Sequence, residues 1–326
     1  MSDGVNISGN KYSLIAMLND GAQLDLTPAI ADLSWADQRG EVAQRATVSL
    51  ARAAVDGGGY LNERIGLCTQ MSVFGNGEEA LRGIAWDWEY DQSNSKLITL
   101  TVYDRFIYAQ KNKDNFYFSK NQKTATILSA ICSRWGIKLD YQWETEYKHE
   151  KTIYRGSTLA DCIQKTLETA RLRTMKKYVA IFDKDTLRIT YPATNSDIYV
   201  FQDSTGLTHK MSMDSLVTRV VITGKEKKGK IPVVVHVEGD TSYGVLQELV
   251  AKGSMSEKKA LREARDILNE RGAPSNSIQL PAPDIPSLRK GHRIKAVCGT
   301  LNGYYIVLGV THSASSRMMV MEIEPE

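Results

Sequence analysis

Two acidic residues, Asp87 and Glu89, are the side chains best placed to do acid–base chemistry. They stand two positions apart in an alternating segment, so a β-strand would place both on one face. Glycoside hydrolysis uses such a pair when the carboxyl groups lie roughly 5–9.5 Å apart across a cleft and one pKa is raised. The alternating Trp86 and Trp88 are more typical of a half-buried strand whose wet face carries the acids. Catalysis by this pair would make the protein a cell-wall carbohydrate hydrolase, which we keep as an alternative function.

A lysine-rich stretch, Gly224–Lys230, fits the spacing G-x-x-x-x-G-K of a phosphate-binding loop. That loop requires Ser or Thr at the next position and then a helix, whereas Ile231 and a β-branched run follow here. The stretch therefore predicts the tip of a β-hairpin that carries solvated lysines. A nucleic-acid-binding module that uses these lysines with Trp86 and Trp88 is a further alternative.

The histidines and cysteines are scattered, and none has the spacing of a metal site or of a known nucleophile motif. They are His149, His209, His236, His292 and His312, and Cys68, Cys132, Cys162 and Cys298. The cysteines are typical of small buried thiols in a reducing compartment. The sequence thus predicts no catalytic, cofactor-binding or metal-binding residues, and no enzymatic activity.

The composition is that of a soluble globular protein. Apolar residues make up 42% and charged residues 24% of the 326 positions, and the net charge of +3 is too small to indicate nucleic-acid binding. The length predicts two or three domains. No signal peptide and no apolar stretch of roughly 20 residues is visible, so we expect synthesis in a cytoplasm and no membrane partner.

The elements that position these residues form two similar β-meanders, at 70–102 and 291–323. In each, a short strand leads through a glycine turn to a long middle strand and then to a third strand. An Arg82-Gly83 or Asn302-Gly303 pair opens the middle strand. Alternation in the first copy predicts one face shared by the side chains of Ile84, Trp86, Trp88 and Tyr90. The matching layout predicts an internal duplication of a β-domain.

Three stretches with helical patterning lie between the meanders. Thr124 begins a helix with an apolar stripe at Ile127, Leu128, Ile131, Cys132 and Trp135, and Thr158–Asp161 begins a second helix, which a hairpin follows. Ser254–Glu257 is a capping-box pattern that begins a helix ending at Gly272. The prediction is an α+β, mainly β fold with segments 1–110, 111–205 and 206–326, the middle one an α+β insertion and the last a β-domain with one helix.

Six short motifs, in order along the chain, carry a resemblance to a known family. They are Asp104–Tyr108 with Lys111–Asp114, Gly156–Asp161, Met213–Val220, Tyr243–Gln247 and Gly303–His312. With them the chain resembles the baseplate hub proteins of contractile phage tails and phage-like tailocins, of the PBSX type represented by XkdQ and YqbQ.

This resemblance implies a structural role in the virion tail baseplate. Such hubs are homotrimers in which each chain carries two tail-tube-like β-barrel domains, so that three chains match the hexameric tail tube. The implied partners are the tail tube protein, a separate spike protein and other baseplate proteins, with no specific nucleic-acid binding. Assembly is expected in the bacterial host cytoplasm.

Overall fold

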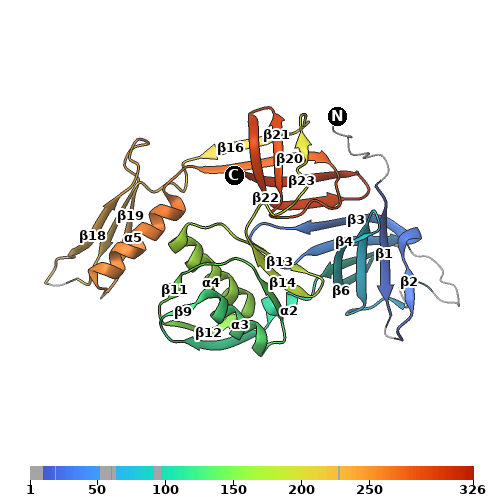
Figure 1. Ribbon diagram of the computed structural model, residues 1–326, viewed down its shortest axis with the longest axis horizontal. Coiled ribbons are helices and arrows are strands. Elements are labelled where there is room, and N and C mark those ends of the chain that lie inside the picture. The colour runs from blue at the N-terminus through green and yellow to red at the C-terminus, as the bar shows by residue number, and fades with distance from the viewer. Residues whose placement is uncertain are drawn as a thin grey trace. The chain divides into compact units, whose positions relative to one another are not determined.

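The computed structural model describes residues 10–18, 20–51, 60, 64–91, 97–226, 228–253 and 255–326 (Figure 1). The chain divides into two compact units. Unit 1 comprises Met1–Leu167, Lys177–Leu207 and Gln279–Glu326, and unit 2 comprises Glu168–Lys176 and Thr208–Ile278. These units are discontinuous along the chain, whereas the three segments expected from the sequence are continuous, and those segments stay a prediction. The mainly β, α+β fold class is confirmed.

The front part of unit 1 is an antiparallel sheet in the order β3-β4-β7-β6-β5-β1-β2. The strands are β1 (Tyr12–Met17), β2 (Gln23–Asp25), β3 (Ile30–Asp37), β4 (Arg45–Ala51), β5 (Gln70–Gly75), β6 (Glu78–Asp91) and β7 (Leu97–Tyr103), with a 3-10 turn η2 (Thr27–Ala29) between β2 and β3. Alternate residues such as Leu33, Val48 and Leu100 are completely buried in one apolar core. Period-two patterning therefore decides which side chains face inward.

The last strands of the chain continue the same sheet. They are β20 (Ser275–Pro283), β21 (Arg293–Cys298), β22 (Leu301–Ser313) and β23 (Met318–Pro325), and the two-residue β15 (Val200–Phe201) pairs with β21. Strand β22 pairs with β21 and β23, which confirms the predicted meander. It also pairs with β3, from Val310 opposite Asp37 to Ser313 opposite Ser34. The front and back strands are therefore joined by main-chain hydrogen bonds.

Residues 107–190 form helices and short strands that belong to unit 1, except that the end of α4 falls in the Glu168–Lys176 segment of unit 2. These are α2 (Ile107–Lys111), β8 (Lys113–Phe118), β9 (Gln122–Lys123), α3 (Thr124–Arg134), β10 (Lys138–Tyr141), β11 (Lys148–His149), β12 (Thr152–Thr158), α4 (Leu159–Thr174), β13 (Val179–Asp183) and β14 (Thr186–Thr190). The hydroxyl oxygen of Thr158 accepts a hydrogen bond from the amide of Asp161, as the capping pattern predicts. The predicted burial of Trp135 is wrong, because α3 ends at Arg134 and Trp135 is 39% exposed.

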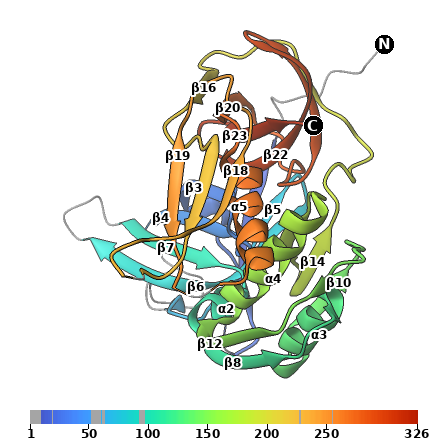
Figure 2. The same cartoon turned by 90° about the vertical axis from the view of Figure 1, so that its left-hand side faces the viewer.

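Unit 2 is a three-stranded sheet covered on one face by a helix (Figure 2). Strand β17 (Arg219–Thr223) lies between the antiparallel β18 (Val233–Glu238) and the parallel β19 (Gln247–Ala251), and α5 (Glu257–Arg271) buries Ala260 and Ala264 against them. Strand β16 (Thr208–Ser212) pairs with β20. The N-cap of α5 is Ser256, without a side-chain cap bond, and Ser254 lies outside the described residues. The predicted end at Gly272 is confirmed.

A bulge in β6 corrects the predicted alternation. Ala85 lies opposite Val102 and Asp87 lies opposite Thr101, so Trp86 is an extra residue. Extra residues of this kind shift every later side chain to the other face. Trp88 and Tyr90 therefore share the core side with Ala85, and the prediction that Ile84 shares that face with them is wrong.

Candidate functional site

The predicted acid pair lies on the solvent face of β6. Asp87 and Glu89 are both exposed, and they stand opposite Thr101 and Thr99 of β7. A catalytic carboxyl with a raised pKa requires an apolar pocket or a second acid close by. The structure places this pair on an open strand surface instead.

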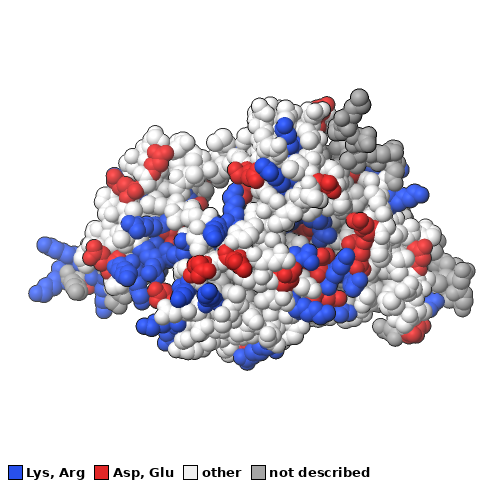
Figure 3. Space-filling view, in the orientation of Figure 1, with Lys and Arg blue, Asp and Glu red and all other residues white. Residues whose placement is uncertain are grey.

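The lysine-rich stretch, of which Lys227 lies outside the described residues, has its other residues at the tip of the β17–β18 hairpin, as predicted. The amide of Gly224 donates to the carbonyl of Pro232, and a strand rather than a helix follows. Unit 2 as a whole contains 15 Lys and Arg residues against 10 Asp and Glu residues. Figure 3 shows this basic excess over α5 and the hairpin. Part of it is neutralised by ion pairs such as Lys252–Glu263 at 2.9 Å and Arg271–Glu248 at 2.6 Å.

The five histidines do not come together. His209 and His236 are exposed, whereas His149 is 3% exposed and burial lowers its pKa to about 4. Burial likewise lowers the pKa of His292 to about 4. Burial raises the pKa of the Cys132 thiol to about 12 and that of Cys162 to about 11. Among the described residues, no three His, Cys, Asp or Glu side chains are grouped to hold a metal ion.

The main polar cluster of unit 1 is buried where the front and back strands meet. Asp284 and His312 are both 0% exposed. The His312 Nδ1 lies 2.6 Å from Oδ1 of Asp284, its Nε2 lies 3.1 Å from the Leu288 carbonyl, and the Tyr12 hydroxyl donates to Oδ2 of Asp284 at 2.5 Å. The cluster therefore joins β1, the segment after β20 and β22. We call it the buried junction.

An ion pair between Arg289 and Asp37 extends the buried junction. The Arg289 Nε donates to Oδ2 of Asp37 at 2.6 Å, and the Trp35 ring stacks on His312 at 3.9 Å. Although burial opposes ionisation of Asp37, the positive charges of Arg289 and Lys290 hold the pKa of Asp37 below its usual value. Sequence reasoning missed Asp37, Asp284 and Arg289. For Asp37 the available signal was a charged side chain at the end of an apolar strand, whereas Asp284 and Arg289 lie outside the strands, in the segment after β20.

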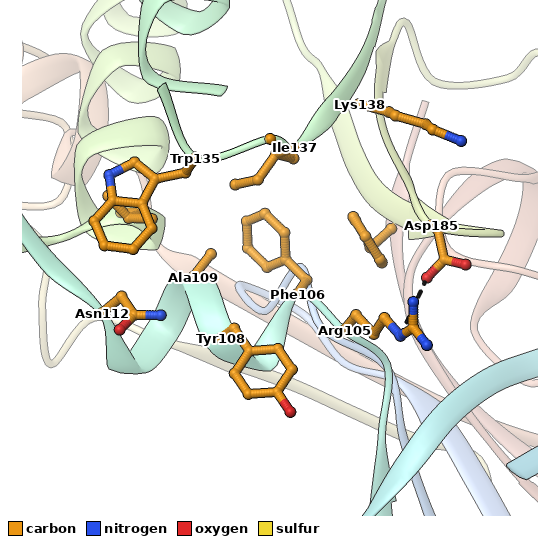
Figure 4. Close-up of a pocket in the computed structure, with 12 residues that line it drawn as sticks. Arg105, Phe106, Tyr108, Ala109, Asn112, Trp135, Ile137, Lys138 and Asp185 are labelled. Atoms are coloured by element: carbon orange, nitrogen blue, oxygen red, sulfur yellow. Dashed lines mark ion pairs between the residues drawn. The ribbon is translucent and has the colours of Figure 1, made fainter. Parts of the chain in front are cut away.

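A surface pocket of about 360 Å³ lies in unit 1 (Figure 4). Its lining residues come from the start and end of α2, the turn between α3 and β10, the start of α4 and the β13–β14 turn. They are Arg105, Phe106, Tyr108, Ala109, Asn112, Trp135, Gly136, Ile137, Lys138, Leu159, Phe182 and Asp185. None of these residues was singled out as a binding residue from the sequence, because they converge from four separate segments.

The helices of the described residues include none long and apolar enough to cross a membrane. A family model described as YQBQ-like matches residues 33–325. The chain belongs to the YQBQ-like family. It is 25% identical over 222 residues to the uncharacterized protein YqbQ of Bacillus subtilis (strain 168). The match covers 66% of this chain and 67% of that protein.

Solved structures show which fold this family member has. The 43 kDa tail protein of prophage MuSo2 from Shewanella oneidensis matches with a TM-score of 0.73 at 12% identity, over 97% of this chain and 98% of that one. A tail protein from Neisseria meningitidis MC58 matches with a TM-score of 0.69 at 9% identity, over 97% of each chain.

A third similar structure comes from a secretion system. The Escherichia coli c3393 protein, described as a type VI secretion system component with structural similarity to the T4 tail proteins gp27 and gp5, matches with a TM-score of 0.53 at 12% identity. The match covers 97% of this chain and 76% of that one. The YQBQ-like chain thus shares its fold with tail proteins along nearly its whole length.

Proposed function

We propose that this protein is a structural baseplate hub of a contractile phage tail or tailocin. Its role is to adapt a hexameric tail tube to a trimeric spike, as a homotrimer in the virion tail. Membership of the YQBQ-like family and the fold shared with tail proteins support this role. The proposal includes no enzymatic activity and no nucleic-acid or membrane partner.

The observation that carries the proposal is the likeness between the two meanders of unit 1. Strands β5-β6-β7 and β21-β22-β23 are both antiparallel, and the middle strands have 14 and 13 residues. Each middle strand contains a bulge, between Ala85 and Asp87 in β6 and between Val307 and Gly309 in β22. Such shared irregularities support a duplication, because a bulge is a specific local feature of a strand.

A duplicated β-domain would allow a trimer to bind a six-fold ring. A three-fold object meets a six-fold ring without mismatch when each of its chains presents two near-equivalent surfaces. The β3–β22 pairing holds the two strand groups in one sheet, which supports a fixed relation between such surfaces. The segments 1–110 and 206–326 would then supply the two tube-like domains, with 111–205 inserted between them.

The test is assembly with purified tail tube protein and spike protein from the same particle. We expect tube rings capped by this protein in electron micrographs, with three copies of the chain for six copies of tube protein by mass measurement. A double variant, Asp87→Asn with Glu89→Gln, should assemble like the wild type. Absence of capped rings would overturn the hub proposal. Cell-wall hydrolysis that the double variant loses would favour the hydrolase instead.

A further inference from the structure

We propose that the pocket of Figure 4 binds a segment of a partner protein in which an aromatic side chain stands next to a carboxylate. The site would be a specific binding site for an acidic aromatic peptide. This inference concerns the unit 1 residues that line the pocket, between 105 and 159 and between 182 and 185, and stands whether or not the chain joins a tube to a spike.

The pocket has an aromatic end whose walls are held in place. Trp135 and Tyr108 are 39% and 42% exposed, so part of each ring is available to a ligand. The indole Nε1 of Trp135 donates to Oδ2 of Asp114 at 2.9 Å, and the Tyr108 ring meets that of Trp86 edge-to-face at 5.8 Å. Rings fixed in advance lose little entropy when a ligand arrives.

The floor of the pocket is apolar and closely packed. Phe106 and Leu159 are each 1% exposed, and the Phe106 and Phe182 rings lie 5.5 Å apart. Ile137 lies between the aromatic end and the charged end in Figure 4. A cavity of about 360 Å³ with an apolar floor is at the small end of the range for ligand sites, which suits one aromatic side chain and its neighbour.

The opposite end of the pocket is positively charged. Figure 4 shows Arg105, Lys138 and Asp185 on the side away from Trp135. The Asp185 carboxylate lies 3.9 Å from Arg105 and 3.8 Å from Arg82, but Arg82 is paired more closely with Glu79 at 2.7 Å, so Asp185 balances Arg105 alone. Lys138 is exposed and has no ion-pair partner among the described residues. The excess positive charge at this end selects a carboxylate over an amine.

The location of Lys138 favours a peptide over a free small molecule. Lys138 is the first residue of β10, and β10 is an outer strand of the sheet β10-β14-β13. An extended segment can pair with the main chain of an edge strand while its side chains enter a neighbouring pocket. A partner segment bound along β10 would therefore gain hydrogen bonds that a free aromatic acid lacks.

The first test compares the affinities of probes that share one apolar group. Binding is monitored through the indole N–H resonances of the five tryptophans in ¹⁵N-labelled full-length protein. The probes are 4-phenylbutyrate, 4-phenylbutanol and 4-phenylbutylamine, and Trp135→Phe assigns the reporter resonance. We expect the Trp135 resonance to shift, with the carboxylate bound about fivefold more tightly than the amine. No shift with any probe, or equal affinity for acid and amine, would overturn the proposal.

A second comparison distinguishes a peptide carboxylate from the carboxylate of a free aromatic acid. The peptide acetyl-Phe-Glu-Val-amide should bind several-fold more tightly than 4-phenylbutyrate, and more tightly than acetyl-Phe-Lys-Val-amide. If the peptide binds no better than the free acid, the site takes a small aromatic carboxylate and the peptide proposal is wrong.

Matched variants connect the binding to the pocket. Lys138→Gln should remove most of the preference for the carboxylate, whereas Lys148→Gln, at an exposed position on β11, should leave it unchanged. Tyr108→Ala should weaken binding by about tenfold, whereas Tyr117→Ala, at a 64% exposed tyrosine of β8, should not. Thermal unfolding of each variant shows that it is folded. Equal effects of the pocket variants and their controls would contradict the proposed site.

Discussion

At the scale of single residues, the buried junction concentrates polar groups that depend on one another. The Leu288 carbonyl can only accept, so Nε2 of His312 donates to it at 3.1 Å, and Nδ1 shares a hydrogen bond of 2.6 Å with the Asp284 carboxyl. Burial raises the pKa of Tyr12, which keeps its hydroxyl protonated as a donor to Asp284. Removing one member of such a network leaves a buried polar atom of its neighbour without its hydrogen bond, which is more costly than never forming the network.

We therefore expect His312→Phe to lower the free energy of unfolding by about 3–5 kcal/mol, because Asp284 and the Leu288 carbonyl both lose their donor. The phenyl ring would keep the stack on Trp35, so the loss reports the polar contacts. Tyr12→Phe removes one hydrogen bond to a carboxylate and should lower it by about 1.5–3 kcal/mol. Urea unfolding at pH 7 measures both. A His312→Phe protein as stable as the wild type would show that these bonds contribute nothing.

At the scale of elements, the sequence predicts the kind and order of strands and helices better than their irregularities. The alternation around Trp88 and the glycine turns predict both meanders, and the stripe of α3 predicts its buried face up to Cys132. The bulge at Trp86 was not visible, because no local signal in the alternating run marks an extra residue. The exposure of Trp135 was missed because a periodic pattern does not show that the helix ends one residue earlier. The pocket was missed for a tertiary reason, since Arg105, Lys138 and Asp185 meet only after folding.

The Arg82-Gly83 and Asn302-Gly303 pairs lie inside the middle strands β6 and β22 and do not open them as predicted, and their two glycines have different surroundings. A Cβ added at Gly83 would lie 2.2 Å from the Tyr103 carbonyl oxygen, whereas one at Gly303 would meet no atom within 4 Å. Gly83→Ala should therefore destabilise the fold by about 1–3 kcal/mol, because the main chain of β7 must move. Gly303→Ala should stay within about 1 kcal/mol of the wild type, on the stabilising side. Thermal unfolding of both variants measures the contrast. Equal effects would mean that β7 yields easily at Tyr103.

At the scale of the whole molecule, the two compact units have separate apolar cores. Unit 2 packs Val220, Ile222 and Val235 against Ala260 and Ala264 of α5, and these residues form a cluster of their own. The core of the front strands is built instead on residues such as Leu33 of β3, and β3 is hydrogen-bonded to β22. Separate cores allow local opening with different free energies, because each cooperative unit depends on its own buried contacts.

Hydrogen exchange on cavity variants tests this separation. Ile222→Ala, at a side chain that is 0% exposed, should lower the opening free energy of β17, β18 and β19 by about 2–5 kcal/mol and leave the amides of β3 and β22 unchanged. Leu33→Ala, also at 0% exposure, should lower protection in β3, β4 and β22 together and spare β17. Amide exchange followed by mass spectrometry of peptide fragments measures the protection of each of these strands in both variants. If Ile222→Ala lowered the protection of β22 as much as that of β17, the chain would unfold as one cooperative body. The segment between β16 and β20 would then contribute to the stability of the large sheet and would not open separately.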